Sequence, residues 1–191
     1  MSGNLTDRKA MLTLDAGAPH VLPLEPSLQD GVLFLIRLVS DPEFMDSRAL
    51  PLLEQAEQVQ DWYVAYRHDV PDGSCSLQVF AWPAGTETKI HDHSSWGAYC
   101  CAWGSVLEER YERLDDGSQP EHASLEKIWQ LWWRPKDGVS TVLPGGEGIH
   151  RVGNPGESTA ISVHLYGPSL GEVDGRDHDP SRDYVCGRRQ D

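Results

Sequence analysis

Two histidines separated by a single residue, His91 and His93, are the first residues in this chain whose types and spacing suggest chemistry. On a β-strand such a pair lies on one face, with the two residues about 7 Å apart along the chain. Both imidazoles could then bind one metal ion, although imidazole suits iron, zinc, copper and nickel alike. The alternative is a pair of half-exposed polar residues, so the neighbouring sequence must decide.

The histidine pair lies between glycines, and a second segment with a similar composition follows it. Gly85 and Gly104 flank the pair, and residues 138–154 form the second segment. The two segments resemble the paired motifs of the cupin superfamily, G-x5-H-x-H-x3,4-E-x6-G and G-x5-P-x-G-x2-H-x3-N, with one extra residue before the histidine of the second. The resemblance implies a mainly β fold, the cupin (double-stranded β-helix or jelly-roll) barrel with N-terminal α-helices. It also implies three metal ligands, His91, His93 and His150.

One departure from the cupin pattern is informative. Gly97 stands four residues after the second histidine, where many cupins carry a glutamate as the fourth ligand. Three neutral histidines without a carboxylate resemble the thiol dioxygenase branch of the cupins, which comprises cysteine dioxygenase and its bacterial mercaptopropionate dioxygenase relatives. That resemblance implies Fe(2+) as the cofactor, since zinc has no redox chemistry with which to activate dioxygen.

Residues 159–166 alternate between apolar and polar side chains, as a β-strand does. Ser162, His164 and Tyr166 share one face of this predicted strand. A solvent-facing edge strand would explain the polar face, and so would a hydrogen-bonded relay. Thiol dioxygenases carry the same Ser-x-His-x-Tyr pattern, which these residues match position for position. The resemblance implies that the Tyr166 hydroxyl points into the metal pocket and that His164, oriented by Ser162, fixes it.

A substrate carboxylate would need a cationic partner, and arginine offers a bidentate one. Arg67 lies near the position where cysteine dioxygenases carry their carboxylate-binding arginine, but the following loop differs in length, so Arg67 and His68 compete for that role. Arg176 lies close to where the mercaptopropionate enzymes carry theirs. A solvated surface charge is the alternative for either arginine.

Two further details separate the branches of the family. Animal cysteine dioxygenases carry a cysteine five residues after the second metal histidine, which cross-links to the tyrosine of the triad. Counting along this chain gives Ala98 at that position, so no cross-link is expected. Residues 91–97 resemble the H-D-H-x-x-W-G of the bacterial mercaptopropionate-type enzymes. The expected substrate is therefore a small mercapto-carboxylic acid, such as 3-mercaptopropionate or mercaptosuccinate, oxidised to a sulfinic acid.

Three other functions stay open at this point. The chain could be a cysteine dioxygenase proper, another metal-binding cupin enzyme, or a cupin that senses a small ligand. The missing glutamate and the Ser-His-Tyr pattern count against another cupin enzyme. A sensor is disfavoured because neither a helix-turn-helix nor a basic patch accompanies the cupin motifs.

Composition limits the partners and the compartment. The 191 residues contain 30 acidic and 16 basic side chains, a formal charge of −14, which argues against nucleic acid and anionic membranes as partners. Because the sequence contains no long apolar run and its first residues are not followed by an apolar segment, neither a transmembrane helix nor a signal peptide is expected. Its four cysteines are expected to be free thiols in a reducing cytoplasm. The expected partners are a small thiol and dioxygen, and the chain is expected to be a monomer or a weak homo-oligomer.

The remaining sequence supplies the elements that must position these residues. Apolar spacing predicts a helix from about residue 27 to residue 39 and a second helical segment from 47 to 66, interrupted or kinked near Asp61. Both lie within an N-terminal arm and helical region, 1–70. Residues 71–191 are expected to form the β-barrel of the same structural domain. Trp129, Trp132 and Trp133 are expected to fill its core and rim. The predicted strands are 76–82, 89–93, 98–103, 105–114, 124–134, 139–143, 149–152 and 159–166.

Overall fold

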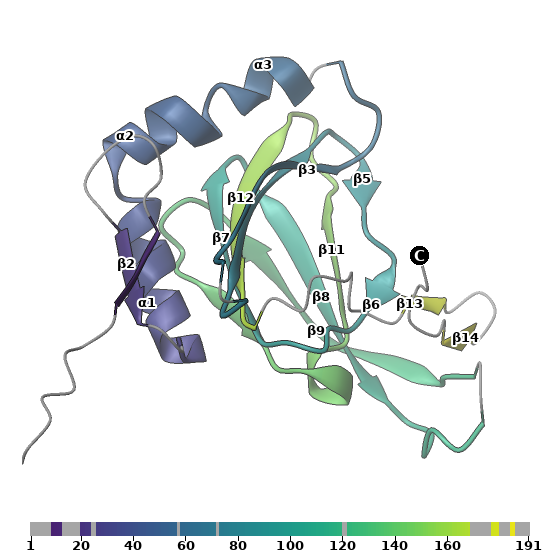
Figure 1. Cartoon of the computed structure of the whole chain (residues 1–191). Helices are drawn as coiled ribbons and strands as arrows, with labels where there is room; N and C mark the ends of the chain where they lie inside the picture. Colours follow the sequence, from purple (N-terminus) through teal and green to yellow (C-terminus); the bar gives the residue numbers. More distant parts are fainter. Residues whose placement is uncertain are drawn as a thin grey trace, which may run out of the picture.

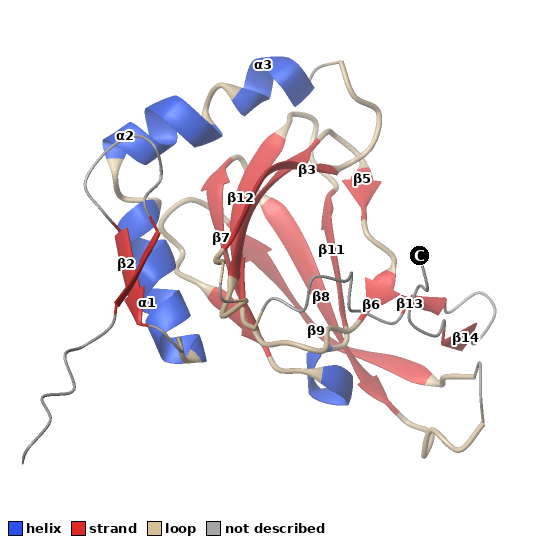
Figure 2. Ribbon diagram, in the orientation of Figure 1, coloured by secondary structure: helices blue, strands red, loops and turns tan. Residues whose placement is uncertain are grey.

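Two antiparallel sheets enclose the centre of the molecule, and helices cover one of them (Figure 1). The structure, a computed structural model, describes residues 9–12, 20–23, 26–56, 58–71, 73–119, 122–168, 177–179 and 184–185. This is the mainly β cupin architecture, a double-stranded β-helix with N-terminal helices, as the motifs predicted (Figure 2). Within the described residues, no helix has the length and apolar character needed to cross a membrane.

The first sheet has five strands and carries the predicted polar strand at its centre. Its order is β10-β7-β12-β4-β3. The bounds are β10 Ser140–Val142, β7 Gly97–Trp103, β12 Ala160–Tyr166, β4 Ser76–Trp82 and β3 Tyr63–Asp69. Because β12 pairs with both β4 and β7, the interpretation of this strand as a solvent-facing edge is wrong.

The second sheet faces the first across the barrel. Its order is β14-β13-β6-β11-β8-β9, and β5 pairs with β11 beside that path. The bounds are β14 Tyr184–Val185, β13 Asp177–Asp179, β6 Ile90–His91, β11 His150–Asn154, β8 Val106–Arg113, β9 Leu125–Trp133 and β5 Thr86–Glu87. A separate hairpin, β1 Lys9–Leu12 with β2 His20–Pro23, precedes the helices.

Helix α1, Leu28–Leu38, begins and packs as its sequence predicts. Ser27 and Asp30 form a reciprocal capping box at its start, which satisfies backbone donors that the first turn leaves free. Phe34, Leu35 and Leu38 are buried in a core shared with the apolar outer face of the five-stranded sheet. The two faces of β12 therefore have different surroundings: its apolar residues pack against the helices, and its polar residues face the barrel interior.

The predicted helix from 47 to 66 is wrong in its second half. The chain forms α2 Pro42–Phe44, the π-helix η1 Met45–Ala49 and α3 Leu52–Ala56, and then the edge strand β3. Residues 63–66 have an apolar content that suits either structure, and pairing with the open side of β4 satisfies their backbone as a strand. The five-stranded sheet thus begins at Tyr63 rather than after residue 70.

The tryptophan-rich strand β9 divides between core and surface. Trp133 is 4% exposed and packs in the core between the sheets, as expected. Trp129 is 44% exposed, so it belongs to the rim rather than to the core. The reason is topological: β9 is the edge strand of its sheet, and the Arg110 guanidinium, 5.4 Å from the ring centroid, covers Trp129 in place of another sheet.

Candidate metal centre

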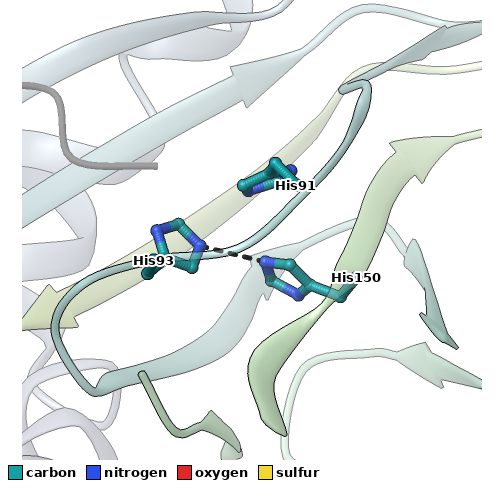
Figure 3. Close-up of side chains that lie close together, drawn as sticks. All are labelled: His91, His93 and His150. Carbon is teal, nitrogen blue, oxygen red and sulfur yellow. Dashed lines mark hydrogen bonds between the residues drawn. The ribbon is translucent and has the colours of Figure 1, made fainter. Parts of the chain in front are cut away.

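The three predicted ligands meet inside the barrel (Figure 3). His91 ends β6, His93 lies in the loop that follows, and His150 begins β11. Their ligating nitrogens all lie within 4.8 Å of one another, and the Nε2 atoms of His93 and His150 are 3.0 Å apart. The strand predicted for 89–93 ends at His91, so His93 reaches the group from a loop instead. The three residues form a metal-binding site.

Backbone contacts hold the two ligand segments together. Residues His91 and His150 are directly opposite one another in the β6–β11 ladder. The Gly145 N–H donates to the His93 carbonyl at 2.7 Å, which ties the ligand loop to the short 3-10 helix η2, Gly145–Gly148. Gly148 must be glycine there, because a Cβ would lie 2.0 Å from the Leu143 carbonyl oxygen. The glycines of the second cupin motif therefore form the tight turn that places His150.

Trp96 anchors the same loop to the rest of the fold. A Cβ added to Gly167, just after β12, would lie 2.3 Å from the Trp96 ring, and one added to Gly31 of α1 would lie 2.9 Å from it. The indole thus fits between two glycines, and the Gly167 N–H donates to the Trp96 carbonyl at 3.1 Å. The loop that carries His93 is therefore fixed at its end by packing against both α1 and β12.

Hydrogen bonds at Nδ1 set the orientation of two of the histidine rings. The Nδ1 of His91 lies 2.8 Å from the Lys89 carbonyl oxygen, and the Nδ1 of His150 lies 2.8 Å from Oε1 of Glu108. Both partners accept, so each Nδ1 carries the hydrogen and each Nε2 keeps its lone pair for a metal. Desolvation holds the pKa of His93 and of His150 well below the usual range, so both are neutral at physiological pH. The donor set fits a divalent transition metal.

Glu108 is a buried carboxylate that the sequence analysis did not select. It is 0% exposed, and His150 Nδ1, Ser140 Oγ and Trp133 Nε1 donate to it at 2.8, 2.6 and 3.1 Å. Arg110 Nε lies 2.6 Å from Oε1 without hydrogen-bond alignment, so this contact is chiefly ionic. Burial raises the pKa of Glu108, and the Arg110 charge opposes that rise. Strand alternation was the available signal, since only one of the adjacent residues Glu108 and Glu109 can face outward.

Replacement of Glu108 with glutamine is expected to lower metal affinity about 10- to 100-fold. The amide can accept on only one side, so it would present N–H groups to donors and leave His150 less firmly oriented. Titration of the metal-free protein with iron(II) measures the affinity. Glu109→Gln is the matched control, because Glu109 lies on the outer face of the same strand with Lys127 and Arg151. Equal affinities in the two variants would contradict the role given to Glu108.

Ser162, His164 and Tyr166 form a connected row on β12. His164 Nε2 lies 2.7 Å from Ser162 Oγ, and His164 Nδ1 lies 3.0 Å from the Tyr166 hydroxyl. Ser162 and His164 are 0% and 3% exposed. The Tyr166 ring centroid is 5.2 Å from that of His93, so the row ends beside the metal ligands. Burial lowers the pKa of His164 to about 3 and raises that of Tyr166, so both are neutral.

The buried neutral His164 predicts acid sensitivity. Its pKa is about 3 in the folded protein and about 6.5 when unfolded, so below pH 6.5 the unfolded state binds the extra proton and stability falls. Between pH 7 and pH 5 this residue alone should cost about 2 kcal/mol of unfolding free energy. Urea unfolding of metal-free wild type and His164→Asn at both pH values measures it. The same pH dependence in both proteins would refute the assignment.

The strand register identifies the residue that lies opposite Tyr166. Gly97, not Ala98, lies directly opposite Tyr166 in the β7–β12 ladder, whereas Ala98 is paired with Leu165 on the helix-facing side. Gly97 carries no thiol at this place, and Ala98 carries none either. Cys100 and Cys101 lie farther along β7, opposite Val163 and Ser162.

Tyr99 fills the space that Gly97 leaves. A Cβ on Gly97 would lie 2.3 Å from the Tyr99 hydroxyl. The Tyr99 ring is fully buried, with its centroid 5.6 Å from that of His150 and 5.7 Å from that of Tyr166, and its hydroxyl has no hydrogen-bond partner among the described residues. No sequence pattern marked Tyr99, because only the missing side chain at Gly97 creates its site.

Replacement of Tyr99 with phenylalanine is expected to stabilise the metal-free protein by about 1 kcal/mol, because it removes a buried hydroxyl without a partner. Thermal or urea unfolding measures the change. Tyr111→Phe provides the contrast, since the Tyr111 hydroxyl donates to Glu109 at 2.9 Å and its loss should destabilise slightly. Destabilisation by Tyr99→Phe would show instead that the hydroxyl has a partner in solution.

The three candidates for substrate binding have different positions. Arg67 is opposite Gln78, which is opposite His164, so Arg67 faces the same side of the sheet as the row on β12. Its Nε lies 3.0 and 2.9 Å from the two Asp69 carboxylate oxygens. His68 is opposite Leu77 and therefore faces the helices. Arg176 lies outside the described residues, one residue before β13, whose Asp177 pairs with His91 in the backbone ladder.

Known proteins resemble the chain in structure at low sequence identity. A Klebsiella pneumoniae protein described as having a double-stranded β-helix domain is 16% identical, with a TM-score of 0.36 over 59% of this chain and 77% of that one. The Schizosaccharomyces pombe Cnp3 cupin domain is 16% identical, with a TM-score of 0.40 over 54% and 59%. An oxalate oxidase in complex with glycolate is 17% identical, with a TM-score of 0.44 over 60% and 53%. The chain thus spans little more than half of the last two.

The sequence itself identifies a family. Residues 46–178, well over half of the chain, match the family described as Cysteine dioxygenase type I. This region contains the three metal-binding histidines, the Ser162-His164-Tyr166 row and Arg67. The chain therefore belongs to the cysteine dioxygenase type I family of the cupin superfamily.

Proposed function

We propose that the protein is a non-haem iron(II) thiol dioxygenase that acts on a small mercapto-carboxylic acid. The observation that supports this most is the donor set: three histidines converge, and Gly97 lies where a fourth, carboxylate ligand would be expected. Such a set leaves the metal its full charge and leaves coordination positions open. Iron(II) bound there would hold the substrate sulfur as a thiolate and activate dioxygen. One thiol and one dioxygen give one sulfinic acid, with no other co-reactant.

The residues around the histidines suit a substrate of this kind. The Tyr166 ring lies beside that of His93, and its hydroxyl could bond to a polar group of a thiol held at the metal site. Arg67 faces the same side of the sheet and offers a guanidinium to a carboxylate. Asp69 compensates part of the Arg67 charge, so a single carboxylate is favoured at this position. We assign Arg176 as a second candidate carboxylate partner.

The residue opposite Tyr166 supports one branch of the family. Gly97 offers no thiol for a cross-link, Cys100 and Cys101 lie farther along β7, and Cys75 precedes β4. Burial raises the pKa of Cys101 to about 12, so it is an unreactive thiol. Together with the H-D-H-x-x-W-G sequence, this favours the bacterial 3-mercaptopropionate dioxygenase-like branch over a cysteine dioxygenase proper.

Oxygen consumption by the iron(II)-loaded protein tests the proposal. Cysteine, 3-mercaptopropionate, mercaptosuccinate and cysteamine are compared in parallel, with the product analysed for a sulfinate. Uptake with one of the mercapto-carboxylic acids is expected. Uptake with cysteine alone would favour cysteine dioxygenase, and uptake with cysteamine alone would refute carboxylate binding. Arg67→Gln should raise KM for the acids and leave cysteamine unaffected. Iron-bound protein that oxidises no thiol would refute the proposed class.

A further inference from the structure

Trp82 extends the hydrogen-bonded row on β12 by one residue. It lies on β4, is 1% exposed, and donates from its indole Nε1 to Ser162 Oγ at 2.7 Å. The Trp82 ring stacks near Phe80 and His164, with centroid separations of 5.7 and 6.5 Å. The row therefore runs from Trp82 through Ser162 and His164, which are buried, to Tyr166, which is partly buried.

The donor capacity of the indole decides which way every hydrogen in this row points. An indole N–H can only donate, so Ser162 Oγ accepts from Trp82. The single hydroxyl hydrogen of Ser162 is then available to His164 Nε2, 2.7 Å away. A neutral His164 that accepts at Nε2 carries its hydrogen on Nδ1 and donates it to the Tyr166 oxygen, 3.0 Å away. The Tyr166 hydrogen is consequently left free to point away from His164.

The opposite direction leaves a buried hydrogen unpaired. Tyr166 would donate to His164 Nδ1, and His164 Nε2–H would donate to Ser162 Oγ, which already accepts from Trp82. The Ser162 hydroxyl hydrogen would then need another acceptor, and no contact described for Ser162 supplies one. Because Ser162 is fully buried, water cannot supply one either, and an unpaired buried hydroxyl is unfavourable.

We propose that Trp82 is a positioning residue: its indole N–H fixes His164 as the Nδ1–H tautomer and leaves Tyr166 as a hydrogen-bond donor to the molecule held at the metal site. The catalytic consequence rests on the proposed thiol dioxygenase function, whereas the order of the hydrogens does not. In this arrangement His164 Nδ1 already carries a hydrogen, so Tyr166 cannot pass its proton to His164. Tyr166 therefore acts as a hydrogen-bond donor rather than as a base.

The tautomer of His164 can be observed directly. Nitrogen-15 NMR of the metal-free, histidine-labelled protein distinguishes Nδ1–H from Nε2–H, and the loss of a signal in His164→Asn assigns the resonance. Wild type is expected to show Nδ1–H only. Trp82→Phe should show a mixture of tautomers, because Ser162 Oγ can then accept from His164. Trp62→Phe is the matched control. The Trp62 ring stacks on that of Trp82, with centroids 5.7 Å apart, but takes no part in the row, so His164 in this variant should have the wild-type tautomer.

A second variant separates the lost hydrogen bond from lost packing. Benzothienylalanine at position 82 keeps the shape of tryptophan and lacks the N–H, so it should reproduce the tautomer mixture even if Trp82→Phe folds poorly. Both variants are expected to keep iron and to lose about 10-fold or more in kcat with little change in KM. An Nε2–H tautomer in wild type, or an unchanged tautomer in the isosteric variant, would overturn the proposal. If the predicted tautomers are found but the protein oxidises no thiol, the proposed direction of the hydrogen bonds stands and only the proposed function is refuted.

Discussion

His93→Ala is expected to abolish stoichiometric iron binding and to reduce thiol oxidation to background. His93 is one of three neutral ligands, and its Nε2 lies 3.0 Å from that of His150, so its loss leaves a two-histidine site without a carboxylate to compensate. The remaining two histidines supply only two of the three coordinating nitrogens. Metal analysis of the purified variant after iron(II) loading and gel filtration measures the occupancy.

His68→Ala is the matched control for this experiment. His68 lies on β3 but faces the helices, opposite Leu77, away from the three ligands. The His68→Ala variant should keep full iron occupancy, and it also tests the predicted role of His68 in substrate binding. Full occupancy in His93→Ala, with a fold unchanged by circular dichroism, would refute the ligand assignment.

Tyr166→Phe is expected to lower kcat/KM for the substrate about 10²- to 10³-fold while iron binding stays unchanged. The hydroxyl is the end of the buried row, beside His93, and the proposed donor to the bound molecule. Phenylalanine keeps the ring and removes only that donor. Steady-state oxygen uptake with iron-loaded protein measures the loss, and metal analysis confirms that the site is intact.

Tyr111→Phe gives a comparison of equal chemistry at a different place. The Tyr111 hydroxyl also bonds to a side chain two residues away on its own strand, Glu109, but on the outer face of the barrel. Its removal should leave oxygen uptake within twofold of wild type. Comparable losses in the two variants would indicate that a general effect of the missing hydroxyl on the fold, rather than donation at the site, explains the result for Tyr166.

The sequence alone determined the parts of this protein that depend on local pattern. Short runs rich in β-branched and aromatic residues, bounded by turn residues, predicted β4 to the residue, and β7, β8, β9 and β12 to within about one residue at each end. Alternation also predicted that Ser162, His164 and Tyr166 share a face, and the cupin motifs predicted that His91, His93 and His150 meet. These predictions succeed because side-chain direction along a strand, and the turns that glycine permits, are properties of neighbouring residues.

Only the tertiary structure decided which residues lie opposite one another. The register of β7 against β12 places Gly97 beside Tyr166, and the register of β3 against β4 separates Arg67 from His68. The contacts of Glu108 with His150 and of Trp82 with Ser162 join residues 42 and 80 positions apart. Residues 63–66 form a strand only because β4 has an open edge to pair with. One chain segment cannot specify such partners by itself, because backbone pairing is satisfied by whichever strand the whole fold brings alongside.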